Sequence, residues 1–250
     1  MRLEILKLTK TFHDPRRAES TAAIQETSFA VETGQLISLI GPSGCGKSTL
    51  LRIIAGLETL TSGSLNIDGG QLKQTRQEVG FVFQEYALFP WRTVRQNVEF
   101  GLETKGISRG VRKKKAREML RRFDLSGFEN SYPGELSGGM KQRVAIARTL
   151  IDDSKLILMD EPFGALDSQT RSHMQQFLLS VWQDMNPTII FVTHNIDEAV
   201  YLSQRVLGMT KRPGCIGIDL AVDLPYPRDV TGNDFNEYRR QLLSFLQKQN

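Results

Sequence analysis

The run Leu36-Ile-Ser-Leu-Ile40, followed at once by Gly41-Pro-Ser-Gly-Cys-Gly-Lys47-Ser48, decides the fold of this chain of 250 residues. Its first five residues are mostly apolar, as expected for a strand buried on both faces of a parallel sheet. The next eight fit the pattern G-x-x-x-x-G-K-[ST], and Thr49–Leu57 after them has the pattern of a helix. Such a pattern arises by chance in roughly one chain in a hundred of this length, and its placement between strand and helix argues further against chance.

This strand, loop and helix predict a phosphate-binding loop, the Walker A motif. Glycines let the backbone curl so that its N–H groups point at phosphate oxygens, and the following helix adds the positive end of its dipole. Lys47 would then neutralise phosphate charge, while the Ser48 hydroxyl would bind Mg²⁺. Cys45 lies beside Lys47 and a helix N-terminus, which predicts a lowered thiol pKa and a reactive side chain. A small residue that the loop merely tolerates is the alternative interpretation.

Two further apolar runs end in residues that can carry chemistry. Leu156–Met159 ends in Asp160-Glu161, and Thr188–Thr193 ends in His194. Because ligands of parallel sheets gather at the carboxyl ends of the strands, we expect these side chains beside the phosphate loop. Asp160 then fits an aspartate that holds Mg²⁺, and Glu161 fits a general base that polarises the attacking water. A solvent-facing acidic pair is the alternative, which the phosphate loop makes less favourable.

The composition predicts a cytoplasmic globular protein. Hydrophobic residues make up 40% and charged residues 24%, and no apolar run approaches the roughly 18 residues that cross a membrane. The N-terminal MRLEILKLTKTF lacks the apolar core of a signal peptide, and the two cysteines without metal-ligand spacing indicate a reducing compartment. The formal net charge of +4 suits work beside an anionic membrane face or nucleic acid.

A second glycine-rich helix start, Leu136-Ser-Gly-Gly-Met140, precedes the run at Leu156–Met159. A helix opened by Ser-Gly-Gly can receive an anion at its N-terminus. Since the Walker loop already accounts for the phosphates of one nucleotide, this second helix end suggests a nucleotide held between two copies of the protein.

Together these motifs resemble those of the ATP-binding cassette (ABC) ATPases. The set stands in the order of that family: Walker A at Gly41–Thr49, a Q-loop glutamine at Gln84, the signature at Leu136–Met140, Walker B with its glutamate at Leu156–Glu161, a D-loop at Ala165–Asp167 and a switch histidine at His194. The resemblance covers about residues 1 to 210, and it departs from the family's pattern at Met140, where glutamine is more common. It implies an α/β fold: a P-loop NTPase (RecA-like) core with a predominantly parallel sheet, an antiparallel β edge region and an inserted helical subdomain.

The resemblance also implies one ABC ATPase domain over residues 1–250. The core would span about 1–92 and 154–210, the helical subdomain about 93–153 and a short C-terminal tail about 211–250. Within the helical part, Arg109–Arg122 contains eight Lys/Arg and one Glu. Apolar residues stand at near-helical spacing along this stretch, at Val111, Met119, Leu120 and Phe123. A solvated basic helix face is therefore favoured over a nucleic-acid site.

Carried over residue by residue, the resemblance implies a site for ATP and Mg²⁺. The nucleotide-binding residues would be Phe12, Gly41, Pro42, Ser43, Gly44, Cys45, Gly46, Lys47, Ser48 and Thr49, and the metal ligands Ser48, Gln84 and Asp160. Glu161, His194, Gln84 and Lys47 would be catalytic, Ser137, Gly138 and Gly139 would contact the ATP of the partner subunit, and Asp167 would connect the two sites of the dimer. Phe12 would stack on adenine; because Asp14–Ser20 separates it from the next strand, an ordinary core aromatic is the alternative.

The segment from Gln84 to Val94 resembles the Q-loop region of bacterial importers. Three short stretches, Pro90-Trp91, Lys211–Cys215 and Leu224–Arg228, resemble the subgroup for nitrate, taurine and alkanesulfonates. The resemblance implies an importer subunit for a small solute, bound peripherally at the cytoplasmic face of the inner (plasma) membrane. Its partners would be a second copy of itself, permease subunits and, indirectly, a solute-binding protein, with no nucleic acid.

The permease would dock near Tyr86–Trp91. Tyr86, Leu88, Phe89 and Trp91 are the candidate apolar anchors for a helix laid into a groove, with core packing as the alternative for each. A non-transport ABC ATPase acting on ribosomes or DNA remains the alternative function. Such proteins usually carry two cassettes or a long coiled-coil insertion, and this chain has neither. The transported solute is not readable from the sequence.

Overall fold

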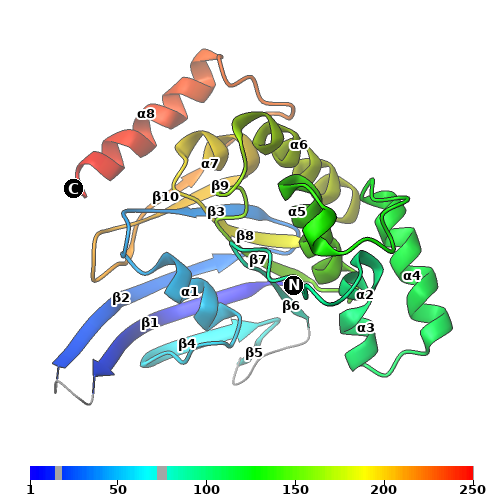
Figure 1. Cartoon of the computed structure of the whole chain (residues 1–250). Helices are drawn as coiled ribbons and strands as arrows, with labels where there is room; N and C mark the ends of the chain where they lie inside the picture. The colour runs from blue at the N-terminus through cyan, green and yellow to red at the C-terminus, as the bar shows by residue number, and fades with distance from the viewer. Residues whose placement is uncertain (15–18, 72–77, 250) are drawn as a thin grey trace.

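A six-stranded sheet forms the centre of the computed structural model, which describes residues 1–14, 19–71 and 78–249 (Figure 1). Its strand order is β10-β9-β3-β8-β7-β6. The strands are β3 (Leu36–Ile40), β6 (Val79–Val82), β7 (Leu156–Asp160), β8 (Thr188–Val192), β9 (Arg205–Met209) and β10 (Ile216–Ala221). Neighbouring strands run parallel except for the antiparallel pair β10 and β9. The three apolar runs predicted as parallel strands are therefore confirmed.

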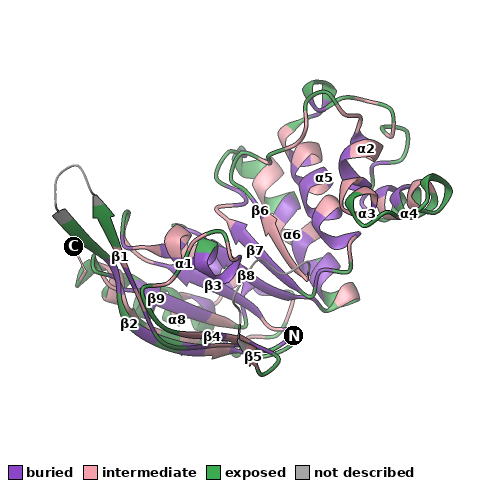
Figure 2. Cartoon of the chain, turned by 90° about the horizontal axis from the view of Figure 1, so that it is seen from below, coloured by how far each residue is buried: buried purple, intermediate pink, exposed green. Residues whose placement is uncertain are grey.

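A four-stranded antiparallel sheet lies beside the central sheet, with the order β2-β1-β4-β5. Its strands are β1 (Leu3–Asp14), β2 (Glu19–Val31), β4 (Ser62–Ile67) and β5 (Gly70–Gln71). Helix α1 (Lys47–Ile54) packs between the two sheets, and its Leu50 and Leu51 share one buried cluster with Leu3 of β1 and Leu39 of β3 (Figures 1 and 2). Most of the predicted insertion at Asp14–Ser20 lies outside the described residues.

The segment between β6 and β7 is helical and projects to one side of the sheet (Figure 1). It holds α2 (Val94–Val98), α3 (Phe100–Thr104), α4 (Arg109–Arg122), the 3₁₀ turn η1 (Pro133–Glu135) and α5 (Gly138–Leu150). Helix α4 buries Ala116 and Leu120 and exposes Lys114 and Lys115, in line with a solvated basic face. The predicted apolar stripe is wrong at Val111, which is 51% exposed, while the buried residues of α4 are Ala116 and Leu120.

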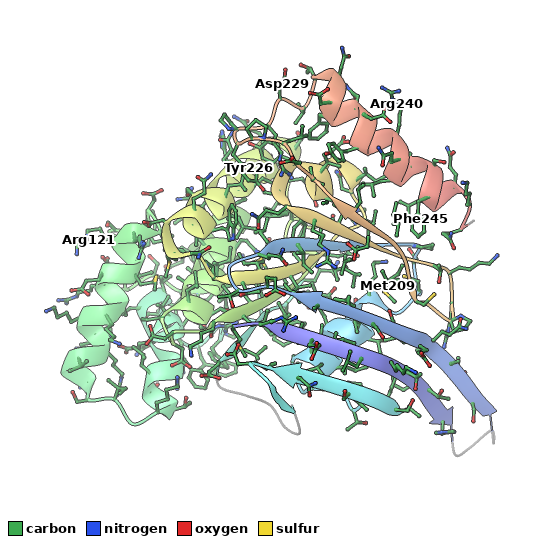
Figure 3. All side chains as sticks on the ribbon, turned by 180° about the vertical axis from the view of Figure 1, so that it is seen from behind. Arg121, Met209, Tyr226, Asp229, Arg240 and Phe245 are labelled. Atoms are coloured by element: carbon green, nitrogen blue, oxygen red, sulfur yellow. The ribbon has the colours of Figure 1, made fainter. Side chains whose placement is uncertain are left out.

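The remaining helices complete the covering of the central sheet. Helices α5 and α6 (Ser168–Met185) pack on the face opposite α1, while α7 (Ile196–Leu202) and α8 (Asn233–Gln247) bury a third cluster near β9 and β10. Phe245 of α8 lies against Gly208 and Gly217, where a Cβ atom would clash with its ring (Figure 3). Within the described residues, no helix is both long and apolar enough to span a lipid bilayer.

Candidate active site

The loop between β3 and α1 curls around the ammonium group of Lys47. Its Nζ atom donates to the backbone oxygens of Gly41 at 2.8 Å and of Pro42 at 2.9 Å. Gly46 precedes α1 with a φ of 107°, and a Cβ atom there would lie 3.0 Å from the backbone oxygen of Ala23. Both the positive φ and this close approach require glycine. The backbone thus brings a cation and a helix N-terminus to one point.

The ends of α1 and β7 meet through a side-chain hydrogen bond. Ser48 Oγ donates to Asp160 Oδ1 at 2.9 Å. Burial raises the pKa of Asp160, and the hydrogen bond from Ser48 opposes that shift. A hydroxyl and a carboxylate are hard oxygen ligands of the kind that Mg²⁺ prefers. Among the described residues, no group of three or more His, Cys, Asp or Glu is arranged so that it could hold a metal ion by itself. Mg²⁺ needs no such group, because it keeps several waters and binds substrate phosphates.

Glu161 and His194 face each other across the ends of β7 and β8. Glu161 has a φ of 46°, a left-handed conformation that is uncommon outside glycine and accumulates at functional sites. Its backbone N–H donates to the backbone oxygen of Val192 at 3.1 Å, and this hydrogen bond fixes the conformation of Glu161 against β8. The carboxylate Oε2 lies 3.3 Å from Nδ1 of His194. A candidate base and an imidazole therefore stand together beside Asp160.

One pocket of about 480 Å³ gathers half of the predicted site residues. It is lined by Phe12, Ala23, Ser43, Gly44, Gly46, Lys47, Ser48, Thr49, Glu161, His194 and Arg212. Phe12 is 39% exposed at this pocket, so it is not a core aromatic. The sequence did not single out Ala23 or Arg212 individually, although Arg212 belongs to the Lys211–Cys215 stretch noted for its resemblance.

Several predicted residues lie outside this pocket. Gln84 is exposed beyond the end of β6, and Ser137 caps α5 by accepting a hydrogen bond from the N–H of Met140. Asp167 caps α6 and accepts hydrogen bonds from the N–H groups of Thr170 and Gln169, which lower the pKa of Asp167. Gly138 and Gly139 stand at the start of α5, where a Cβ atom would press on Leu166 or Thr170. The roles of these five residues stay predictions.

The prediction of a lowered thiol pKa for Cys45 is wrong. Its side chain is fully buried behind the Walker loop and does not line the pocket. This burial raises the pKa of the Cys45 thiol, although Lys47, whose Nζ lies 3.8 Å from Sγ, opposes the shift. The proximity to Lys47 was predictable, whereas the direction in which the thiol points was not.

A polar network connects the D-loop to the residue before the switch histidine. Arg171 donates to the backbone oxygens of Phe163 at 3.4 Å and of Leu166 at 2.8 Å, and its Nε lies 3.6 Å from Glu198 Oε1. The other oxygen of Glu198 accepts a hydrogen bond from Thr193 Oγ1 at 2.6 Å. No motif in the sequence indicated this arrangement, because its members come from three separate segments.

A larger pocket of about 740 Å³ lies where β6, α3 and α5 meet. It is lined by Val79, Gly80, Phe81, Phe83, Ala87, Phe89, Phe100, Gly101, Thr104, Arg148, Thr149, Asp152 and Ser154. Trp91 is 72% exposed, with its ring centroid 5.8 Å from that of Phe89. Tyr86 and Leu88 instead pack partly against the core, as the alternative interpretation had it. We call this pocket the side groove.

Comparison with known proteins decides the family. The family model described as ABC transporter matches residues 24–164 of the chain. The chain belongs to the ABC transporter family. One ABC relative, an uncharacterized ABC transporter ATP-binding protein of Methanocaldococcus jannaschii, is 48% identical over 98% of this chain and 91% of the relative. This ABC subunit is therefore an ATPase whose hydrolysis of ATP is coupled to transport, as the sequence predicted.

Other relatives of this ABC subunit carry more specific names. An aliphatic sulfonates import ATP-binding protein of Bacillus cereus is 46% identical, with 93% of this chain and 92% of the relative aligned. A nitrate import ATP-binding protein of Synechocystis is also 46% identical, over 96% of this chain and 90% of the relative. Among solved structures, a dimeric ATP-binding cassette in a post-hydrolysis state bound to ADP and Pi superposes with a TM-score of 0.76. It is 33% identical, and the match covers 89% of this chain and 100% of that cassette.

Proposed function

We propose that this ABC subunit hydrolyses ATP to power the import of a small oxoanion of the sulfonate or nitrate type. The observation that carries the proposal is the single pocket that gathers the Walker loop, Glu161 and His194. The named import relatives, which align over more than nine-tenths of this chain, support the direction and the class of solute.

Within the pocket, the residues divide the work of phosphoryl transfer to water. Lys47 and the Walker loop would hold the phosphates of ATP, while Ser48, Asp160 and, from the Q-loop, Gln84 would hold Mg²⁺. The bound metal would neutralise charge on the β- and γ-phosphate oxygens. Glu161 accepts the proton of the attacking water. The His194 imidazole, 3.3 Å away, orients the Glu161 carboxylate. Phe12, which also lines the pocket, stacks on the adenine ring.

The signature residues act on the nucleotide of a second copy. Ser137, Gly138 and Gly139 open α5 and do not line the pocket, which leaves them available to the ATP of a second copy. An N-terminal helix end with glycines suits contact with a γ-phosphate presented by the partner subunit. Asp167 then connects the two sites, and the dimeric state of the solved relative supports this assembly.

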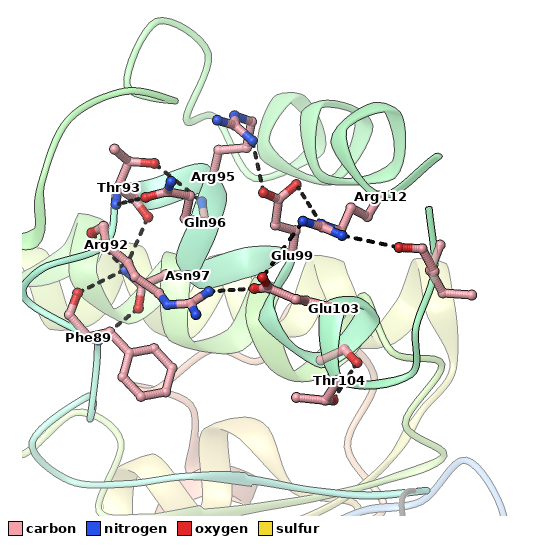
Figure 4. A network of polar contacts seen from close by, with 12 residues as sticks. Phe89, Arg92, Thr93, Arg95, Gln96, Asn97, Glu99, Glu103, Thr104 and Arg112 are labelled. Carbon is pink, nitrogen blue, oxygen red and sulfur yellow. Dashed lines mark hydrogen bonds and ion pairs between the residues drawn. The ribbon is translucent and has the colours of Figure 1, made fainter. Parts of the chain in front are cut away.

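The side groove receives a short helix of the permease. Phe89 is held there by Asn97, which accepts from its N–H at 2.8 Å and donates to its carbonyl oxygen at 3.1 Å (Figure 4). Arg92 lies over the rings of Phe89 and Phe100 and pairs with Glu103 at 2.6 Å. A rigid aromatic floor beside exposed Trp91 fits an apolar helix face. This docking places the subunit at the cytoplasmic face of the membrane, below a permease that receives solute from a binding protein.

Transport and ATP hydrolysis measured together test the proposal. The chain with Phe89→Ala and Trp91→Ala is reconstituted with its permease and solute-binding protein in vesicles containing ATP. We expect sulfonate or nitrate uptake to be lost while basal ATP hydrolysis persists. The matched control is Phe128→Ala, another exposed aromatic, which does not line the side groove. Loss of uptake and hydrolysis together would make the pair a folding element, and unchanged uptake would refute docking at the side groove.

A further inference from the structure

The turn between β9 and β10 packs directly against the back of the Walker loop. A Cβ atom on Gly214 would lie 2.0 Å from the backbone oxygen of Cys45, so this position requires glycine. The N–H of Gly214 donates to the backbone oxygen of Ala23 at 3.1 Å. The carbonyl oxygen of Gly214 accepts a hydrogen bond from the N–H of Gln25 at 2.9 Å. Backbone hydrogen bonds to β2 therefore fix this turn from the C-terminal part of the chain beside the nucleotide pocket.

The fixed turn presents Arg212 to that pocket. Its Nε donates to the backbone oxygen of Ala22 at 3.3 Å, and its side chain lines the same pocket as Lys47 and Phe12. In the β1–β2 ladder, Ala22 pairs with Thr11, the neighbour of Phe12, so the anchor of Arg212 lies at the Phe12 end. Among the residues whose side chains are described, no carboxylate lies within ion-pair distance of Arg212.

We infer that Arg212 is a nucleotide-binding residue that contacts the base and ribose of ATP. This inference rests on the proposed ATP site and adds to it a residue that comes from the other end of the chain. A guanidinium group suits this place because it is planar, always charged and able both to stack on a flat ring and to donate hydrogen bonds. Its anchor at Ala22, which pairs with the neighbour of Phe12, assigns it to the base end, while Lys47 serves the phosphates.

Calorimetric titration of the full chain with ATP, ADP and AMP tests the assignment. Arg212→Ala is expected to raise the Kd of all three nucleotides by the same factor, about threefold to tenfold for a partly exposed charged contact. Arg212→Lys, which keeps the charge but loses the planar fork, is expected to fall between wild type and Arg212→Ala. The matched control is Lys211→Ala, since Lys211 is exposed and does not line the pocket.

Each outcome bears on the assignment. Unchanged Kd values for Arg212→Ala would overturn it, and a loss confined to ATP would overturn the placement at the base end. If Arg212→Ala fails to fold by thermal denaturation, Arg212→Gln replaces it, because glutamine keeps an N–H donor while it removes the charge and the guanidinium plane. A wild-type chain that binds no nucleotide would overturn the proposed function as well, whereas normal wild-type binding with unaffected variants overturns only the role of Arg212.

Discussion

Replacing Glu198 by glutamine is expected to lower the rate of ATP hydrolysis while it leaves the free energy of unfolding nearly unchanged. The Glu198 side chain is 8% exposed, and it accepts a hydrogen bond from Thr193 at 2.6 Å. Glutamine keeps the size and one acceptor oxygen but removes the charge that faces Arg171. Because Thr193 directly precedes His194 in the chain, a weaker hydrogen bond between Thr193 and residue 198 is expected to change the position of His194.

The expected change in the free energy of unfolding is small because two effects oppose each other. A neutral hydrogen bond in place of a charge-assisted one costs about 1 kcal/mol. The contact with Arg171 adds little, since 3.6 Å exceeds hydrogen-bond distance and Arg171 is 32% exposed. Burial, however, raises the pKa of Glu198, so keeping its carboxylate ionised destabilises the fold at neutral pH. Glutamine removes that cost, which leaves a net change within about 1 kcal/mol.

The pH dependence of this balance follows from the direction of the shift. Because the folded pKa of Glu198 is raised above its ordinary value of 4.5, the relative advantage of glutamine is full at pH values above the raised pKa. It shrinks as the pH falls through that pKa, and it is gone below 4.5, where the wild-type side chain is protonated in both states.

Steady-state ATP hydrolysis and thermal denaturation, measured on the same samples, provide the assay. We expect Glu198→Gln to lower kcat by about 10- to 100-fold, the range for a displaced catalytic group, with little change in KM or Tm. Thr193→Val should lose kcat similarly, and Thr193→Ser should retain it. Asp197→Asn, on the same helix but paired with Arg239, is the control. An unchanged kcat in Glu198→Gln and Thr193→Val would refute the reasoning.

Two further predictions concern buried groups. Arg228 is buried and donates to the backbone oxygens of Val200, Ser203, Val222 and Leu224, so Arg228→Met should lower the free energy of unfolding by about 2–4 kcal/mol. Chemical denaturation checks this against the exposed Arg240→Met, and equal stability of the two variants would contradict it. Cys45, buried and with a raised pKa, should be alkylated more slowly than half-buried Cys215 in the native protein. Peptide mass spectrometry over time measures both rates, and faster labelling of Cys45 would show that the Walker loop opens.

Local sequence patterns predicted those elements and site residues that depend on neighbours along the chain or on the ends of parallel strands. The run Leu36–Ile40 has the bounds of β3, and Arg109–Arg122 those of α4. The contact between Ser48 and Asp160 was also predictable, because both stand at the carboxyl edge of one parallel sheet, where ligands gather.

Long-range packing and side-chain direction account for what the sequence did not predict. Arg212 lines the nucleotide pocket from a turn in which Gly214 packs against Cys45, a contact across some 170 residues of sequence. The Cys45 side chain belongs to the buried cluster that includes Leu39 and Leu50, and the motif pattern does not specify this direction. The network through Arg171 joins three segments, each of which looks ordinary by itself.

ATP binding and turnover by Glu161→Gln test the central claim most directly. The substitution leaves the Walker loop untouched and removes the candidate base 3.3 Å from His194. Nucleotide affinity is expected to remain near that of wild type, while kcat falls by about 100-fold or more, as when a general base is lost, and an ATP-bound dimer accumulates on size-exclusion chromatography. Turnover at the wild-type rate by Glu161→Gln would contradict the account.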